Sequence, residues 1–201
     1  MSALYRCFYG CSGERGDSLN TILARRIHAR DELAFRSFVE HYQSGIFAFT
    51  YAVTADRSEA DELAQRIFVR ARRCAKRFDP TIPVCTWLYR IAFHECVLHN
   101  RIRTLRKLAK AFHGLFRGRT AMCAGPLPNA NEVGRRYSIL DALKSLSTRK
   151  RALLALREVG HQSIADLTQI TGEDAKAIRH ELLVARRKLL KAVQRLDAKR
   201  N

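Results

Sequence analysis

The helical spacing of apolar residues constrains this chain more than any other feature. From residue 31 to residue 54, apolar side chains recur at steps of three and four, in a set made of Leu33, Ala34, Phe38, Tyr42, Ile46, Phe49 and Val53. This spacing places them on one face of an α-helix. A second stripe comprises Ala60, Leu63, Ala64, Ile67, Phe68 and Ala71. No alternating strand pattern of useful length is present, so we expect an all-α fold.

Turn and cap residues divide the helices from one another. Asp56 and Ser58 separate the first two helices and recap the chain. The second helix ends near Pro80 and Pro83 because proline cannot continue a helix. We expect the third helix to run from about Thr86 to beyond residue 103. Further helices are predicted at about 137–145, 149–158, 163–170 and 174–196.

Glycine and proline gather between Gly118 and Gly134, which predicts a linker. The chain is therefore expected to form two small helical domains joined by a flexible linker. The predicted boundaries are a flexible tail at 1–17, a first domain at 18–117, the linker at 118–136 and a second domain at 137–201.

The net charge of +18 predicts a polyanion partner, either nucleic acid or an anionic membrane surface. The excess is about +2 over residues 17–95, about +7 over 96–142 and about +8 over 143–201. The concentration of positive charge in the second half indicates a specific basic binding surface rather than charge that only keeps the protein soluble. The sequence has no apolar run near the roughly 20 residues that span a bilayer, and its start does not look like a signal peptide. We expect a cytoplasmic protein whose cysteines are reduced.

The last two predicted helices have the pattern of a helix-turn-helix. Ser163 and Asp166 have the spacing of a capping box, and Thr171–Gly172 supplies the turn before Asp174 caps the next helix. The second helix buries a stripe of Ile178, Leu182, Ala185, Leu189 and Val193. An ordinary helical hairpin can have a similar sequence pattern, so the pattern alone does not distinguish a helix-turn-helix from a hairpin.

A set of cysteines and histidines in the third helix raises the alternative of a metal site. Cys85 and Cys96 lie about 16 Å apart along a helix axis, and His94 and Cys96 point to opposite sides. Only Cys96 and His99 have a spacing that lets two side chains share an ion, and a structural zinc site usually needs four ligands. We therefore expect no metal, no cofactor and no catalytic residues, and nothing in the sequence predicts an enzyme.

Three strings in order, "AFRSFVEHY", "SEADELAQRIFVRA" and "FDPTIPVCTWLYRIA", followed by a basic run and a helix-turn-helix, resemble the extracytoplasmic-function (ECF) sigma factors of bacteria. The resemblance covers about residues 33–103 and 141–191. It implies a non-catalytic subunit that binds core RNA polymerase, at the clamp of its large subunit and at its flap, and directs it to promoter DNA. It also implies that an anti-sigma factor is a possible partner.

The resemblance assigns three groups of residues. Core-polymerase binding falls on Asp61, Glu62, Leu63, Gln65 and Phe68. Recognition and melting of the −10 element falls on Asp79, Thr86, Trp87, Arg90, His94, Arg101 and Arg103, with a loop from Asp79 to Thr86 receiving a flipped base. Recognition of the −35 element falls on Lys176, Arg179, His180, Leu183, Arg186 and Arg187.

Five residues depart from the family pattern as the resemblance presents it. They are Arg66, His94, Leu98, Glu181 and Val184. Arg66 stands where the family usually has an acidic residue, and this charge reversal is expected to weaken or retune polymerase docking. Because of the other four departures, the promoter preference of the family cannot be transferred to this chain. A free-standing helix-turn-helix regulator remains the alternative; it would bind duplex DNA alone and would leave the acidic 61–68 segment without a role.

Overall fold

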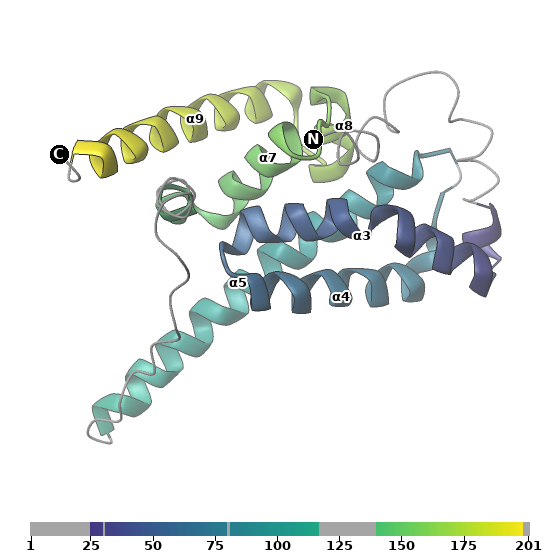
Figure 1. The fold of residues 1–201 in the computed structure, drawn as a ribbon, viewed down its shortest axis with the longest axis horizontal. Coiled ribbons are helices and arrows are strands. Elements are labelled where there is room, and N and C mark those ends of the chain that lie inside the picture. Colours follow the sequence, from purple (N-terminus) through teal and green to yellow (C-terminus); the bar gives the residue numbers. More distant parts are fainter. Residues whose placement is uncertain (1–24, 30, 80, 117–139, 199–201) are drawn as a thin grey trace.

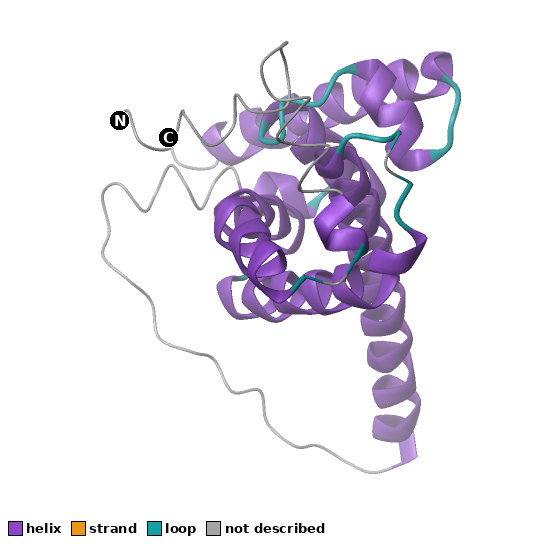
Figure 2. Cartoon of the chain, turned by 90° about the vertical axis from the view of Figure 1, so that its right-hand side faces the viewer, coloured by secondary structure: helices purple, strands orange, loops and turns teal. Residues whose placement is uncertain are grey.

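The computed structural model describes residues 25–29, 31–79, 81–116 and 140–198, and these residues form helices joined by short loops (Figures 1 and 2). Short helical pieces lie at 25–28 and 140–144. The main elements are α3 (Glu32–Thr54), α4 (Arg57–Cys74), the 3₁₀ turn η2 (Ala75–Arg77), α5 (Val84–Phe116), α7 (Thr148–Glu158), α8 (Ile164–Thr171) and α9 (Ala175–Ala198). The expected all-α class is confirmed. The predicted tail and the whole predicted linker lie outside the described residues.

Helices α3 and α4 form a hairpin whose ends are fixed by aspartates. The Asp31 carboxylate accepts hydrogen bonds from the backbone N–H groups of Leu33 and Ala34, at 3.0 and 3.2 Å. Asp56 caps α4 in the same way, accepting from the N–H of Glu59 at 2.9 Å. These caps satisfy backbone donors that have no partner inside the helix. The predicted break at Asp56 is thereby confirmed.

Helix α5 begins after Pro83, two residues earlier than the sequence indicates. Its first half packs against α3 and α4, and its second half extends away from the helical body (Figure 1). Trp87 packs edge-on against Phe78 with ring centroids 4.9 Å apart, and against Phe38 at 6.3 Å. This aromatic cluster anchors the segment before α5 to α3.

Helices α8 and α9 form the predicted helix-turn-helix. Ser163 and Asp166 make the full capping box, and the turn passes through Gly172 with φ of 76°. At that angle a side chain is disfavoured, which explains the glycine. Ile178, Leu182 and Ala185 are buried as predicted, and Leu189 and Val193 are half-buried.

The second half of the chain packs directly on the first. Helix α7 contacts both α3 and α5, and α8 contacts α5, so one continuous apolar core includes residues of both halves. Arg151 on α7 donates to the backbone carbonyl of Val53 at 2.6 Å. Leu153 and Leu156 on α7 belong to the same apolar core as Phe49 on α3. No helix within the described ranges is both long and apolar enough to cross a membrane.

Candidate functional site

The outer face of α4 presents the residues expected to bind polymerase, with one exception. Asp61, Glu62 and Gln65 are exposed, and Phe68 is half-buried with its ring 6.1 Å from that of Phe38. Leu63 is fully buried at 0% exposure. Leu63 therefore supports α4 from beneath, and the expectation that it offers a direct contact is wrong for this arrangement.

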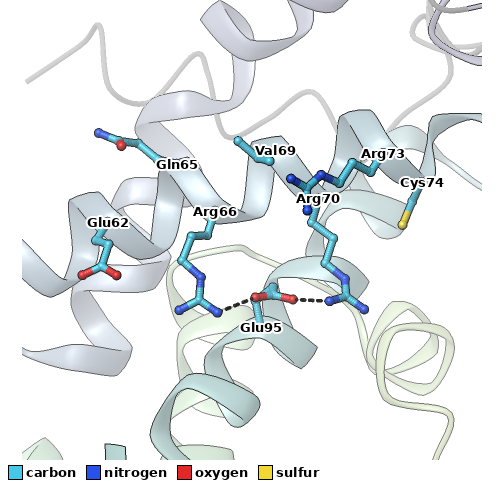
Figure 3. Close-up of a pocket in the computed structure, with 8 residues that line it drawn as sticks. All are labelled: Glu62, Gln65, Arg66, Val69, Arg70, Arg73, Cys74 and Glu95. Carbon is cyan, nitrogen blue, oxygen red and sulfur yellow. Dashed lines mark hydrogen bonds and ion pairs between the residues drawn. The ribbon is translucent and has the colours of Figure 1, made fainter. Parts of the chain in front are cut away.

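A buried glutamate from α5 organises the same face. Glu95 is 4% exposed, and its carboxylate lies 3.2 Å from Arg66 and 2.8 Å from Arg70, which are one turn apart on α4 (Figure 3). A buried carboxylate is tolerated only when it is paired and hydrogen-bonded. Arg66 thus has a structural partner, which accounts for its presence where the resemblance presents an acid.

The ion pairs continue along the seam between α4 and α5. Arg66 also lies 3.2 Å from Nδ1 of His99, and His99 lies 4.0 Å from the carboxylate of Glu59. Glu59 in turn pairs with Arg103. Arg103 is therefore held by a glutamate, whereas Arg101, two residues earlier, is exposed.

The predicted base-receiving loop is shorter than expected. Asp79 is exposed, and its carboxylate accepts hydrogen bonds from the N–H and hydroxyl of Thr81, at 2.9 and 2.7 Å. The backbone hydrogen bond from Thr81 lowers the pKa of Asp79. Thr86 lies inside α5 and is buried at 2% exposure, so the expectation that the loop reaches Thr86 is wrong. The chain enters the helix early because Val84 and Cys85 belong to the buried core.

The resemblance assigns Trp87 to the support of this loop, and the structure places its ring against Phe78, which directly precedes the loop. Trp87 is 8% exposed and is held between Phe78 and Phe38. Arg90 and His94 are exposed one turn apart on the next part of α5. Partial burial, followed by the nearby charges of Arg90 and Arg70, lowers the pKa of His94, so this ring is neutral near pH 7.

The outer face of α9 carries the residues expected to read the −35 element. Exposed side chains gather there, namely Lys176, Arg179, His180, Leu183, Arg186 and Arg187. Arg186 pairs with Glu158 of α7, its Nε donating at 3.2 Å. Lys176, Arg179 and Arg187 form no ion pair with any residue that the structure describes, so their charges are directed to solvent.

Glu181 has an internal role. Its carboxylate accepts from Nε of Arg149 at 3.2 Å, and Glu173 pairs with the same guanidinium. The Arg149 guanidinium also lies 5.9 Å from the ring centroid of Phe93 on α5. Val184, the second departure on this helix, is half-buried. Glu181 is thus part of the contact between the helix-turn-helix and α5.

No metal-binding group of three or more His, Cys, Asp or Glu side chains occurs in the described part of the chain. Cys96 is buried, and burial raises the pKa of its thiol, which disfavours the thiolate that a metal requires. Cys85 takes part in a disulfide bond, so the expectation that every cysteine is reduced is wrong for this residue.

Sequence reasoning missed Glu95, Arg70 and Arg149. The signal for Glu95 was present: it lies seven residues after Leu88 and three after Ala92, on the apolar stripe of α5. An acid at a core position predicts a basic partner across the interface. Nothing in the sequence identifies Arg149 as a bridge, because its partners come from three other segments.

Comparisons with known proteins show which proteins this chain resembles. The family model for sigma-70 region 2 matches residues 38–109, which contain most of α3, all of α4 and most of α5. The chain is 29% identical over 175 residues to the ECF RNA polymerase sigma factor SigG of Mycobacterium tuberculosis, covering 77% of this chain and 47% of SigG. The chain thus spans about half the length of SigG. It is 24% identical to SigW of Bacillus subtilis, over 86% of this chain and 95% of SigW.

Two solved structures share the fold. CnrH, in complex with the cytosolic domain of CnrY, has a TM-score of 0.62 at 21% identity, covering 87% of this chain and 97% of that one. RpoE of Bartonella quintana, in complex with the anti-sigma factor NepR, has a TM-score of 0.60 at 19% identity, covering 80% and 96%. The fold and the matched segment together define a sigma-70-type helical protein. Within that class, the chain is similar to the ECF RNA polymerase sigma factors SigG and SigW.

Proposed function

We propose that this chain directs promoter-specific transcription initiation in the cytoplasm by binding core RNA polymerase and reading −10 and −35 promoter elements. One observation carries the proposal: the segment that matches sigma-70 region 2 lies within α3–α5, and the same chain carries a helix-turn-helix whose first helix has a capping box. The family is not enzymatic, so the chain would act through binding alone.

The exposed residues would form three binding surfaces, one for core polymerase and two for promoter DNA. Asp61, Glu62 and Gln65 on α4 would contact the clamp of core polymerase. Asp79, Arg90, His94 and Arg101 would contact the melted −10 strand, above the support that Trp87 provides. A flipped base needs a basic track beside it, and the exposed side chains of Arg90 and Arg101 on α5 would supply positive charge for one.

The α9 face would enter the major groove at the −35 element. Lys176, Arg179 and His180 lie at the N-terminal end of that helix, where side chains of a recognition helix reach base edges. Arg187 lies further along and suits a phosphate contact. Glu181 pairs with Arg149, which removes one charge that this face would otherwise show to DNA.

Reconstituted transcription tests the proposal. The purified chain is added to core RNA polymerase from the bacterium that encodes it, with a library of genomic fragments, and the 5′ ends of the transcripts are sequenced. We expect RNA that starts downstream of a shared pair of elements and that disappears without the chain. Failure to bind core polymerase and to start RNA from any fragment would contradict the proposal. Tight duplex binding without polymerase would instead favour a free-standing regulator.

An anti-sigma factor is the second partner that we propose. The solved structures of CnrH and RpoE are complexes with CnrY and with the anti-sigma factor NepR, respectively. Exposed apolar side chains on this chain, at Leu183 and Leu190 of α9, offer a surface for such a partner. Co-purification of a protein from the source bacterium that inhibits the reconstituted transcription would support this assignment.

A further inference from the structure

An open cavity of about 530 Å³ lies against the outer face of α4, next to Glu95. All but one of its lining residues come from a single face of α4, at helical spacing, and Glu95 closes it from α5 (Figure 3). The lining is Glu62, Gln65, Arg66, Val69, Arg70, Arg73, Cys74 and Glu95. We call this hollow the α4 cleft.

The charges in the α4 cleft do not balance. Three guanidinium groups face two carboxylates, which leaves one positive charge. Glu95 is shared by Arg66 and Arg70, at 3.2 and 2.8 Å. Arg73 is exposed and makes no ion pair with any residue in the described ranges. The excess therefore lies at the C-terminal end of the cleft, near Arg70 and Arg73.

We propose that the α4 cleft receives a carboxylate side chain of core RNA polymerase, which pairs with Arg73 and Arg70. This inference rests on the proposed function and names the chemistry of the partner at the polymerase-docking face. An arginine fork binds a carboxylate through two parallel hydrogen bonds, and a cavity excludes part of the competing water. The acidic 61–68 segment would thus be followed, on the same helix, by an arginine pair that is complementary to an acid.

The lining favours a protein side chain over a nucleic-acid phosphate. Val69 is 50% exposed at the middle of the cleft, where an apolar stem of a side chain would cover it. The carboxylates of Glu62 and Glu95 would repel a chain of phosphates, whereas a single carboxylate can reach Arg73 without approaching Glu62. Glu95 also fixes Arg70 in place, so less side-chain entropy is lost on binding.

Charge reversal at Arg73 tests the proposal. Arg73→Glu, Arg73→Lys and the unchanged chain are titrated against core RNA polymerase by fluorescence anisotropy, with circular dichroism as a check of folding. Arg36→Glu, an equal reversal at an exposed position of α3, is the matched control. We expect Arg73→Glu to weaken binding by about tenfold or more, Arg73→Lys by much less, and Arg36→Glu hardly at all.

Three results would overturn the inference. If Arg73→Glu binds core polymerase as the unchanged chain does, no carboxylate pairs with Arg73, and the proposed function still stands. The same holds if the variant loses affinity only for promoter DNA after assembly, because the cleft then contacts nucleic acid. If the unchanged chain does not bind core polymerase, the proposed function fails and this inference fails with it.

Discussion

At the scale of single residues, two of the five departures from the family pattern have ion partners inside the chain. Arg66 meets Glu95, and Glu181 meets Arg149. Each of these two side chains forms half of an ion pair within the chain. A change at one of these positions therefore acts on stability as well as on the surface that binds a partner.

Replacing Arg66 by the acid that the family pattern presents should destabilise this chain. Arg66→Glu leaves the buried Glu95 with Arg70 alone and sets a like charge beside it. We expect a loss of about 2 kcal/mol in the free energy of unfolding, measured by urea denaturation.

The double variant Arg66→Glu/Glu95→Gln should recover part of that loss, since it removes the repulsion. Arg73→Glu, on the same face without an ion pair among the described residues, is the control and should change stability by less than about 0.5 kcal/mol. Equal stability of Arg66→Glu and the unchanged chain would show that the Glu95 pair is not important for folding.

Tyr89 makes stability depend on alkaline pH. Burial, with a smaller effect of Tyr42, raises the pKa of Tyr89 to about 12 from its usual value of 10. The unfolded chain then loses the phenol proton at a lower pH than the folded chain, so stability is lost as pH rises from about 10 to 12. Tyr89→Phe removes the titrating phenol and should flatten the decline by about 1.4 kcal/mol between pH 9 and pH 11. Urea denaturation of both proteins at pH 9 and pH 11 measures the difference; identical slopes would contradict it.

At the scale of elements, the sequence predicts helices well because each has a stripe, a cap or a breaker. The predicted 149–158, 163–170 and 174–196 correspond to α7, α8 and α9 within two residues at each end. The start of α5 was missed because Thr86 follows a proline-containing turn whose length depends on how Phe78 and Trp87 pack. Ion partners such as Glu95 for Arg66 were missed because periodicity shows which face is buried but not what lies against it.

The helix-turn-helix depends on its glycine for backbone conformation. Gly172 has φ of 76°, and a Cβ there would meet no other atom within 4 Å. Gly172→Ala therefore costs backbone strain rather than a clash, and we expect about 1 kcal/mol of destabilisation.

Gly172→Asn is the matched variant, because asparagine tolerates the left-handed region better than alanine. In thermal unfolding, the midpoint temperature should be highest for the parent protein with glycine, lower for Gly172→Asn and lowest for Gly172→Ala. A Gly172→Ala protein as stable as the parent would mean that the turn relaxes to a negative φ.

At the scale of the whole molecule, the packing of the two halves conflicts with simultaneous reading of two promoter elements. The names of the −10 and −35 elements place their centres about 25 base pairs apart, which is about 85 Å of duplex. Here α8 contacts α5 directly, and the eight residues of α8 span only about 12 Å. The reading face of α9 therefore lies much closer to α5 than the two elements lie to each other.

Promoter binding should thus separate α7–α9 from α3–α5. Spin labels carried by unnatural amino acids at Ser37 on α3 and Lys188 on α9, both exposed, report the distance between the halves. We expect a short distance in the free chain and an increase of several tens of ångströms in the complex with polymerase and promoter DNA. Arg149→Ala removes the side chain that links Glu173, Glu181 and Phe93. In the free chain, this variant should broaden the distribution of spin-label distances toward longer values. An unchanged short distance in an active promoter complex would mean that one of the two elements is not read by this chain.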